Sequence, residues 1–210
     1  MDFFEVINTR KTIRKYKSDN PPVEDIERII DSARVAPNAN NAQNWKFIAI
    51  YNQAIKQEMK QAVLDKYDEI AKWPQAEKYK SQIEGSKHYS EFFADAPVVI
   101  AVVELPKTSY LNELMNKRGI PLHEILTVRP DSSLLSIGAA IENMSLTSHA
   151  LGYGTCWMCA PIIAQKEFNK ILSLPDDNKI VSLLTVGKPL DENNSSVLKK
   201  QLSEVMEIIE

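Results

Sequence analysis

The run Pro97-Val98-Val99-Ile100-Ala101-Val102-Val103 constrains the fold of this chain more than any other segment. It is continuously apolar and rich in β-branched residues, which is typical of a strand buried on both faces. Three further strands are predicted at Phe47–Tyr51, Thr155–Met158 and Ile180–Val186. Helical patterns separate these strands, so we expect an α+β fold.

The clearest helical pattern follows Pro21-Pro22, a pair that suits the first turn of a helix because first-turn amides lack partners. The four residues Ile26, Ile29, Ile30 and Ala33 then fall at i, i+3, i+4 and i+7, which defines one buried stripe. Further helices are predicted at Asp2–Thr9, Gln53–Asp68, Gln75–Tyr89 and Tyr110–Lys117.

A long helix is predicted in the second half of the chain. Asp131 or Ser132 can cap its start, and Gly152 can supply the left-handed residue that stops it after Leu151. Its apolar residues, Leu134 among them, suit a helix that neighbours enclose.

The chain has only six glycines, and no glycine-rich strand-to-helix turn follows any predicted strand. We therefore predict neither a dinucleotide-binding fingerprint nor a P-loop, and a nucleotide would have to be held in another way. The sequence shows no internal repeat and no long Gly/Ser linker. We expect one domain over residues 1–210.

The composition excludes several classes of protein. With 44% hydrophobic residues, 25% charged residues and a net charge of −3, the chain is too apolar for disorder and too acidic for a general nucleic-acid binder. No stretch reaches the ~18 apolar residues of a membrane span, and the acidic N-terminus is unlike a signal peptide. We expect a cytoplasmic protein with no membrane or nucleic-acid partner.

The residues Arg10-Lys11-Thr12-Ile13-Arg14, here called the cationic segment, place three cations and a hydroxyl at the exit of a predicted helix. A phosphate monoester is bound by such groups, because guanidinium forks and hydroxyls donate hydrogen bonds to its oxygens. The alternative is a solvated basic turn, which is favourable where cations offset the dipole of a helix C-terminus.

The residues from Ala36 to Trp45, here called the amide loop, contain several asparagines and a glutamine between an apolar helix and an apolar strand. Side-chain amides donate and accept hydrogen bonds at once, so they suit the polar edge of an isoalloxazine ring or a ribityl chain. The alternative is an Asn-rich loop that caps its own backbone.

Together with later motifs, these segments resemble the nitroreductase family of flavoproteins. The family patterns Arg-Arg-Ser-Ile-Arg-x-Phe and Pro-Ser-x-x-Asn-x-Gln-Pro-Trp correspond to residues 10–16 and 37–45. Leu-Gly-x-Gly-(Thr/Ser)-Cys-Trp corresponds to residues 151–157, and Leu-Pro-x-(Asp/Glu) to residues 174–177. The motifs occur in family order over nearly the whole chain. The resemblance implies a mainly antiparallel sheet flanked by helices and an intertwined homodimer that binds FMN across the subunit interface.

The resemblance also implies the residues that contact FMN. The phosphate is expected on Arg10, Lys11, Thr12 and Arg14, assisted by a basic residue near the C-terminus, either Lys199 or Lys188. From the other subunit, the ring is approached by Pro37, Asn38, Ala39 and Asn41. Backbone groups of Met158, Cys159 and Ala160 are expected near the ring and its N5 atom.

The chain departs from the family patterns at several of these positions. Thr12 keeps the hydroxyl of the usual Ser, whereas Asn38 and Asn44 replace a Ser and a Pro. Lys188 stands where the family often has Tyr, and no Arg stands near Lys199. These departures bear on the C-terminal phosphate contact and on the contact between Asn38 and the ring.

The activity that the resemblance implies is an FMN-dependent oxidoreductase with a ping-pong mechanism. Hydride from NADH or NADPH passes to flavin N5, and an electron-poor acceptor such as a nitroaromatic or quinone is then reduced. The cofactor carries this chemistry, so we expect no catalytic side-chain acid or base. The alternatives are a dehalogenase or flavin-fragmenting enzyme on the same fold, and a flavin-binding protein without turnover.

Cys156 and Cys159 form a Cys-x-x-Cys pattern, which is found in thiol oxidoreductases and in metal sites. A tetrahedral metal site needs further ligands, and the three histidines are scattered without ligand spacing. In a strand, residues i and i+3 point to opposite faces. We therefore expect no metal site, with Cys156 in the core and His149 packed and hydrogen-bonded inside its helix.

Overall fold

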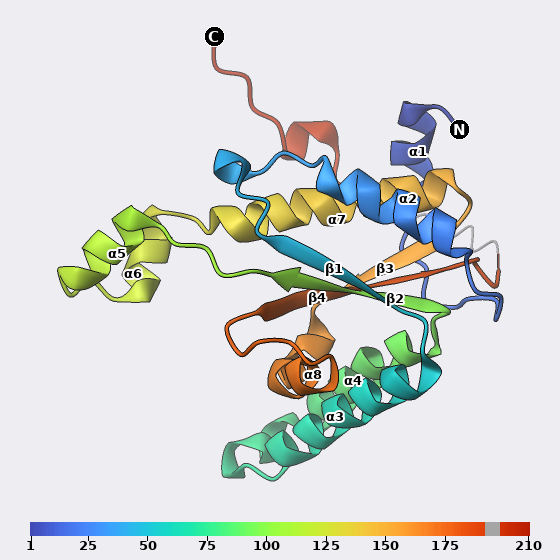
Figure 1. Cartoon of the computed structure of the whole chain (residues 1–210), viewed down its shortest axis with the longest axis horizontal. Coiled ribbons are helices and arrows are strands. Elements are labelled where there is room, and N and C mark those ends of the chain that lie inside the picture. The colour runs from blue at the N-terminus through green and yellow to red at the C-terminus, as the bar shows by residue number, and fades with distance from the viewer. Residues whose placement is uncertain (192–197) are drawn as a thin grey trace.

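The computed structural model describes residues 1–191 and 198–210 and contains one four-stranded sheet, shown in Figure 1. Its strands are β1 (Trp45–Ile50), β2 (Val98–Glu104), β3 (Gly154–Met158) and β4 (Lys179–Gly187). They lie in the order β1-β2-β4-β3, and every neighbouring pair is antiparallel. The prediction of a mainly antiparallel sheet flanked by helices is confirmed.

Two layers of helices cover the two faces of the sheet. The helices α2 (Val23–Arg34) and α7 (Ser132–Ala150) lie on one face, and α3 (Gln53–Ala71), α4 (Lys80–Glu91) and α8 (Gln165–Ile171) lie on the other, as Figure 1 shows. Alternate residues of β2 pack into the two cores, so that Ile100 faces α2 and α7 whereas Val99 faces α3 and α8. The strand is buried on both faces, as predicted.

Helix α7 begins and ends at the predicted signals. The Asp131 side chain accepts hydrogen bonds from the backbone N–H groups of Ser133 and Leu134, and Gly152 adopts a φ of 84° directly beyond the helix. The expectation that neighbours enclose the helix is wrong for one flank of its first turns, although Ser133, Ser136 and Ile137 there are buried. Leu134 and Leu135 are 47% and 68% exposed, because this flank of α7 faces away from the sheet and has no cover within one chain.

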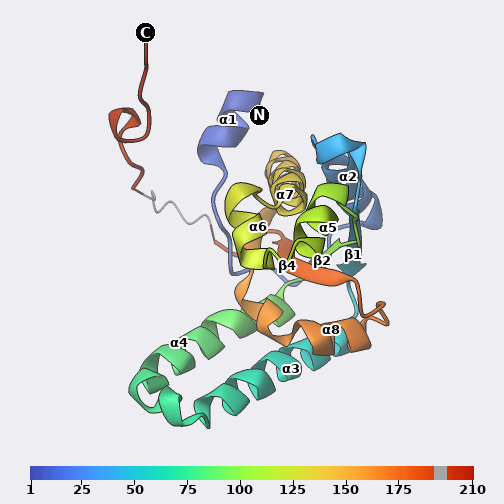
Figure 2. The same cartoon turned by 90° about the vertical axis from the view of Figure 1, so that its left-hand side faces the viewer.

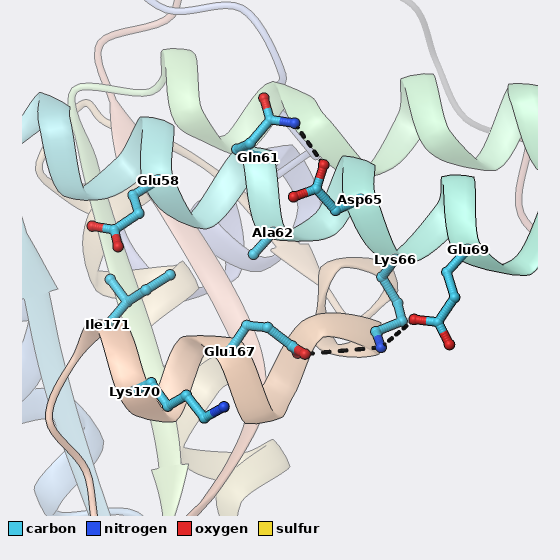
Figure 3. Close-up of a pocket in the computed structure, with 9 residues that line it drawn as sticks. All are labelled: Glu58, Gln61, Ala62, Asp65, Lys66, Glu69, Glu167, Lys170 and Ile171. Atoms are coloured by element: carbon cyan, nitrogen blue, oxygen red, sulfur yellow. Dashed lines mark hydrogen bonds and ion pairs between the residues drawn. The ribbon is translucent and has the colours of Figure 1, made fainter.

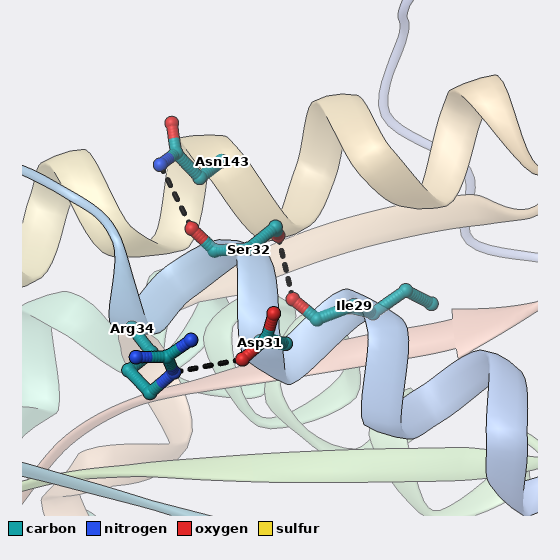
Figure 4. Close-up of polar contacts among 5 residues, drawn as sticks. All are labelled: Ile29, Asp31, Ser32, Arg34 and Asn143. Carbon is teal, nitrogen blue, oxygen red and sulfur yellow. Dashed lines mark hydrogen bonds and ion pairs between the residues drawn. The ribbon is translucent and has the colours of Figure 1, made fainter.

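Helix α2 is fixed to α7 at its C-terminal end, as Figure 4 shows. Asn143 Nδ2 donates to the carbonyl oxygen of Ser32 at 2.9 Å, and Ser32 Oγ donates to the carbonyl of Ile29 at 2.6 Å. Arg34 Nε and Asp31 Oδ1 form an ion pair at 2.7 Å in the last turn. The amide loop leaves α2 directly beyond this anchored end.

Helices α3 and α4 form a long antiparallel hairpin, here called the α3–α4 hairpin, that extends from the sheet in Figure 2. Its base is tied to the start of β2, since the buried Lys56 Nζ donates to the carbonyls of Ala96 and Pro97 at 2.5 and 3.0 Å. The predicted helix at Gln75–Tyr89 is wrong in its first part. Residues Pro74–Tyr79 form a 3-10 helix, and α4 begins only at Lys80.

The remaining elements are short. Helix α1 (Phe3–Thr9) and helix α5 (Tyr110–Lys117) occur where the sequence predicts them, whereas helix α6 (Leu122–Val128) is not among the predicted elements. The 3-10 helices are η1 (Ala39–Asn41), η2 (Pro74–Tyr79), η3 (Phe92–Asp95), η4 (Ala160–Ala164) and η5 (Leu202–Glu204). No helix in the described part of the chain is both long and apolar enough to cross a membrane.

Candidate functional site

The cationic segment lies along the outer edge of β3. The backbone N–H of Ile13 donates to the carbonyl of Thr155 at 2.8 Å, and Thr12 forms a parallel bridge with the same residue. A Cβ atom on Gly154 would lie 2.5 Å from Ile13 Cγ1, so this close approach requires glycine. The motif around Gly154 and the cationic segment therefore meet in space, although more than half of the chain separates them.

The two arginines of the cationic segment have different partners. Arg10 Nε lies 3.4 Å from Glu142 Oε1 on α7. Arg14 Nη2 donates to the hydroxyl of Tyr89 on α4 at 2.5 Å, and its guanidinium carbon lies 5.2 Å from the centre of the Tyr89 ring. The Thr12 side chain between them is exposed. The segment thus presents two guanidinium groups and a hydroxyl at one edge of the sheet.

The pKa of His149, in the last turn of α7, depends on the charge around the cationic segment. Its Nε2 lies 2.8 Å from Thr9 Oγ1, whose own proton goes to the carbonyl of Glu5 at 2.6 Å, so Nε2 donates. Burial lowers the pKa of His149 first, and the nearby charges of Arg10 and Lys11 lower it further. The positive potential here is the kind that binds an anion. The predicted hydrogen bond of His149 is present, and its side chain is half-buried at the surface.

The amide loop is held in an unusual backbone shape. Asn40, Asn41 and Gln43 have φ values of 60°, 50° and 45°, in the left-handed region that asparagine tolerates better than most residues. Asn38 Oδ1 accepts from the backbone N–H of Gln43 at 3.0 Å, so the loop does cap its own backbone at this residue. The exposed Asn41 side chain stays available for other contacts.

Serines of α7 hold the amide loop at the N-terminal end of that helix. The backbone N–H of Ala39 donates to Ser136 Oγ at 3.2 Å, and the buried Asn44 donates from Nδ2 to Ser133 Oγ at 3.1 Å. Lys107 Nζ adds a contact to the carbonyl of Ala39 at 3.3 Å. The exposed Pro37 precedes this anchored part of the loop.

The cationic segment and the amide loop lie at opposite ends of α7. The segment contacts the helix through Arg10 at Glu142, and Thr9, the residue before the segment, bonds to His149. The loop contacts the helix at Ser133 and Ser136. With a rise of ~1.5 Å per residue, Ser136 lies about 9 Å along the helix axis from Glu142 and about 20 Å from His149. Among the residues that the structure describes, no hydrogen bond or ion pair joins the amide loop to the cationic segment. One chain therefore does not bring these two predicted halves of the site together.

Met158, Cys159 and Ala160 continue β3 beyond the point where the cationic segment pairs with it. Met158 is buried, whereas Cys159 and Ala160 are exposed at the surface. A cavity of about 450 Å³ lies between Ala160 and helix α4, and Tyr89 forms part of its wall. The structure thus places these predicted ring contacts near the cationic segment.

The two C-terminal lysines occupy different surroundings. Lys188 follows β4 and is exposed, and its carbonyl accepts from the backbone N–H of Lys17 at 2.9 Å, which places it beside the continuation of the cationic segment. Lys199 lies in the C-terminal segment that leaves the body of the molecule in Figure 1. Within the described residues no hydrogen bond or ion pair joins it to the cationic segment.

The two cysteines differ in the way expected from their spacing. Cys156 is buried and Cys159 is exposed, and both are free thiols. Burial raises the pKa of the Cys156 thiol, although Arg14 opposes this effect. A raised pKa is the opposite of what a thiol oxidoreductase needs. Residues 1–191 and 198–210 contain no cluster of three potential metal ligands.

Sequence reasoning missed four residues that shape the site: Tyr89, Ser133, Ser136 and Glu142. The pair Ser133 and Ser136 carried a usable signal, because buried hydroxyls three residues apart on an apolar helix need a partner. Tyr89 and Glu142 carried none, since their partners are distant in the sequence and polar helix faces usually contact only solvent.

Comparisons with known proteins bear on this arrangement. The model of the nitroreductase family matches residues 7–188. Iodotyrosine deiodinase from Hydra vulgaris is 26% identical over 98% of this chain and 72% of its own length. The crystal structure of a BluB-like flavoprotein from Clostridium difficile is 27% identical, with a TM-score of 0.83 over the whole of both chains. A nitroreductase with bound FMN from Bacteroides fragilis shares the fold at 19% identity, with a TM-score of 0.71 over the whole of both chains.

Proposed function

The chain belongs to the nitroreductase family, and on this premise we propose that it is an FMN-dependent oxidoreductase. It takes reducing equivalents from NADH or NADPH and delivers them to an electron-poor acceptor of the nitroaromatic or quinone type, in two successive half-reactions at one site. The observation that carries this proposal is the docking of the cationic segment on β3, at the edge that leads to Met158, Cys159 and Ala160.

The residues of the site fit the chemistry of FMN. Arg10, Lys11, Thr12 and Arg14 would hold its phosphate, because they gather positive charge and a hydroxyl at one edge. The pKa of His149 is lowered first by burial and then by the charges of Arg10 and Lys11, which is consistent with a positive potential there. Lys188 is the better-placed basic assistant, because its backbone is bonded to the chain just beyond the cationic segment. Lys199 would assist only if a second chain brought it there.

When bound, FMN supplies hydride chemistry, and the side chains of the protein need only position the reactants. Arg14 would hold the phosphate with a permanent positive charge and so help to fix the position of the ring. The exposed backbone at Cys159 and Ala160 leaves space for a flat reactant beside β3. In this role no side chain has to give or take a proton.

We propose that the working unit is a homodimer, because one chain separates the amide loop from the cationic segment. In a second copy, Pro37, Asn38, Ala39 and Asn41 would approach the ring from across the interface. Exposed apolar side chains lie on the elements that would form this interface: Phe3, Phe4, Leu134, Leu135, Trp157, Leu202, Ile208 and Ile209. An apolar surface of this extent is typical of a protein that buries it against a partner.

The visible spectrum of the purified protein tests the cofactor assignment. We expect a flavin spectrum that bleaches when NADH or NADPH is added and returns when a nitroaromatic is added. We further expect Arg10→Ala to lower FMN occupancy more than turnover per bound flavin, with an affinity loss of about tenfold, since a charge-assisted hydrogen bond contributes ~1.5–3 kcal/mol. Absence of flavin, with no binding of added FMN, would contradict the proposal.

Reductive dehalogenation is a second candidate, because iodotyrosine deiodinases are among the relatives of this chain. A panel of acceptors separates the two possibilities. Release of iodide from an iodotyrosine at a rate above that of nitroaromatic reduction would favour the dehalogenase, and the reverse order would favour the activity proposed above.

A further inference from the structure

Two neighbouring cavities lie along the α3–α4 hairpin, beside the edge where FMN is proposed to bind. The cavity of about 450 Å³ lies between α4 and Ala160, and a second cavity of about 410 Å³ lies farther out between α3, the 3-10 helix η2 and α4. Tyr67, Gln82 and Ser86 line both cavities, so the two are directly adjacent. Together they lead from the proposed flavin position into the hairpin.

The walls of the two cavities have different character. The outer cavity has aromatic and aliphatic walls, which include Trp73 and Tyr79, with exposed fractions of 53% and 48%. The inner cavity, next to Ala160, has uncharged hydrogen-bonding groups instead. Its Tyr67 hydroxyl lies 3.0 Å from Ser90 Oγ, which in turn bonds to the carbonyl of Ser86 at 2.6 Å.

Neither cavity has a formal charge among its described lining residues, although a quarter of the chain is charged. Lys78 lies over the ring of Tyr79 at 4.9 Å but does not line the space. The guanidinium of Arg14 lies over the Tyr89 ring, and the proposed phosphate of FMN would neutralise it. A carboxylate that entered this space would lose water without gaining a charged partner.

The opposite flank of α3 shows that this neutrality is local. A cleft of about 470 Å³ between α3 and α8, shown in Figure 3, is lined by Glu58, Gln61, Ala62, Asp65, Lys66, Glu69, Glu167, Lys170 and Ile171. Some of its charges pair with one another, since Lys66 Nζ lies 2.7 Å from Glu69 and 3.8 Å from Glu167. One helix thus separates a charged cleft from an uncharged one.

We propose that the cavities of the α3–α4 hairpin form the acceptor subsite and that this subsite selects neutral aromatic acceptors over anionic and zwitterionic ones. The aromatic body of the acceptor packs against Trp73 and Tyr79, and its polar substituent meets the hydroxyls and the Gln82 amide of the inner cavity. The inference rests on the proposed function and narrows it. It disfavours an amino acid such as iodotyrosine as the preferred substrate of this chain.

Three ligands that share one nitrophenyl ring test the selectivity: 4-nitrobenzyl alcohol is neutral, 4-nitrobenzoate is anionic and 4-nitrophenylalanine is zwitterionic. Equilibrium dialysis against the purified protein gives their affinities without requiring turnover. We expect the alcohol to bind about tenfold more tightly than the other two, because an uncompensated charge is costly to desolvate. Equal binding of all three, or tighter binding of the zwitterion, would overturn the proposal.

Two variants with matched controls test the location. Trp73→Ala should weaken binding of the alcohol about three- to tenfold, whereas Tyr110→Ala, which removes an exposed aromatic side chain on α5 outside both cavities, should not. Gln82→Lys should raise the affinity for 4-nitrobenzoate relative to the affinity for the alcohol by about threefold or more. Gln61→Lys in the charged cleft should leave this ratio of affinities unchanged. Equal effects of the variants and their controls would place the subsite elsewhere.

The flavin content of the same preparations distinguishes a failure of the proposed FMN-dependent activity from a failure of the proposed acceptor subsite. A protein without FMN that still prefers the neutral ligand would refute the proposed function and retain the subsite. A protein that binds FMN and is reduced by NADH or NADPH, but shows no preference among the ligands, would support the proposed function and refute the subsite.

Discussion

The two ends of α7 hold the two parts of the candidate site in different ways. Along the C-terminal half of α7, charge dominates: Arg10 pairs with Glu142 near the middle of the helix, and His149 in the last turn bonds to Thr9 just before the cationic segment. At the N-terminal end, neutral hydrogen bonds from Ala39 and Asn44 to serines hold the amide loop. The difference shows that one chain carries two separate parts of the site. The cationic segment is suited to an anion and the amide loop to the polar edge of a ring, and the two do not meet within one chain.

The largest expected effect comes from breaking the charged end alone. Gly154→Ala would place a Cβ atom 2.5 Å from Ile13 Cγ1 and so force the cationic segment away from β3. We expect FMN affinity to fall by at least about tenfold, since several charge-assisted hydrogen bonds would be misplaced. Fluorescence titration with FMN measures this change.

Gly138→Ala is the matched control for Gly154→Ala. Its Cβ would lie 3.6 Å from the Trp157 ring, which is ordinary contact, and alanine also favours a helix over glycine. We expect FMN affinity to stay unchanged in this variant. Equal losses in the two variants would mean that the cationic segment does not hold the cofactor through its docking on β3.

A smaller effect is expected at the neutral end. Ser136→Ala removes the acceptor for the backbone N–H of Ala39 and should loosen the amide loop. We expect FMN affinity to fall about threefold, because a neutral hydrogen bond contributes ~0.5–1.5 kcal/mol. The same titration measures this change. A loss of FMN affinity as large as that of Gly154→Ala would contradict the expected difference between the two parts of the site.

The pKa of His149 measures the positive charge near the cationic segment in the unmodified protein. Its pKa is lowered by burial and then by Arg10 and Lys11, so the folded state disfavours protonation relative to the unfolded state, whose ordinary pKa is 6.5. The stability linked to His149 is therefore present above that pH and is lost as the pH falls through the lowered folded pKa.

A phosphate dianion at the cationic segment should raise the pKa of His149, because it offsets the cations that lower it. NMR titration of the ring protons with and without FMN measures the change, and the exposed His88 serves as the internal reference. A pKa of His149 that FMN leaves unchanged would place the phosphate elsewhere.

The smallest effect is expected at the cysteines. Cys156→Ala with Cys159→Ser should keep turnover per bound FMN within about twofold, because the cofactor and not a thiol carries the chemistry. Steady-state assays corrected for flavin content measure this. Loss of all activity in the double variant would revive the thiol oxidoreductase.

Local patterns in the sequence predicted the elements that position the site. The β-branched run predicted β2, and the signals at Asp131 and Gly152 predicted the two ends of α7, because caps and strand periodicity depend on neighbouring residues. The 3-10 helix at Pro74–Tyr79 was missed because its residues read equally well as the start of α4. The order of the strands could not be read, since the pairing of β2 with β4 depends on distant residues.

The candidate site was predicted in its parts and not in its assembly. The motifs identified the cationic segment and the amide loop, but not that the segment docks beside Gly154 or that Tyr89 covers Arg14. The uncharged cavity along the α3–α4 hairpin was also out of reach. Its walls come from two polar helices, and the sequence of either helix alone does not indicate which of its residues will line a cavity.

The central claim, that each FMN site combines the cationic segment of one chain with the amide loop of another, can be tested by mixing two defective variants. Arg10→Ala with Arg14→Ala impairs one part, and Asn41→Asp impairs the other by placing a negative charge at the ring edge while keeping the size of the side chain. Differently tagged variants are co-expressed, the mixed dimer is isolated, and its tightly bound FMN is counted. We predict one FMN per mixed dimer with the affinity of the unmodified protein, because one of its two sites escapes both defects. A mixed dimer whose sites are all weak would contradict the account, since each site would then be built from a single chain.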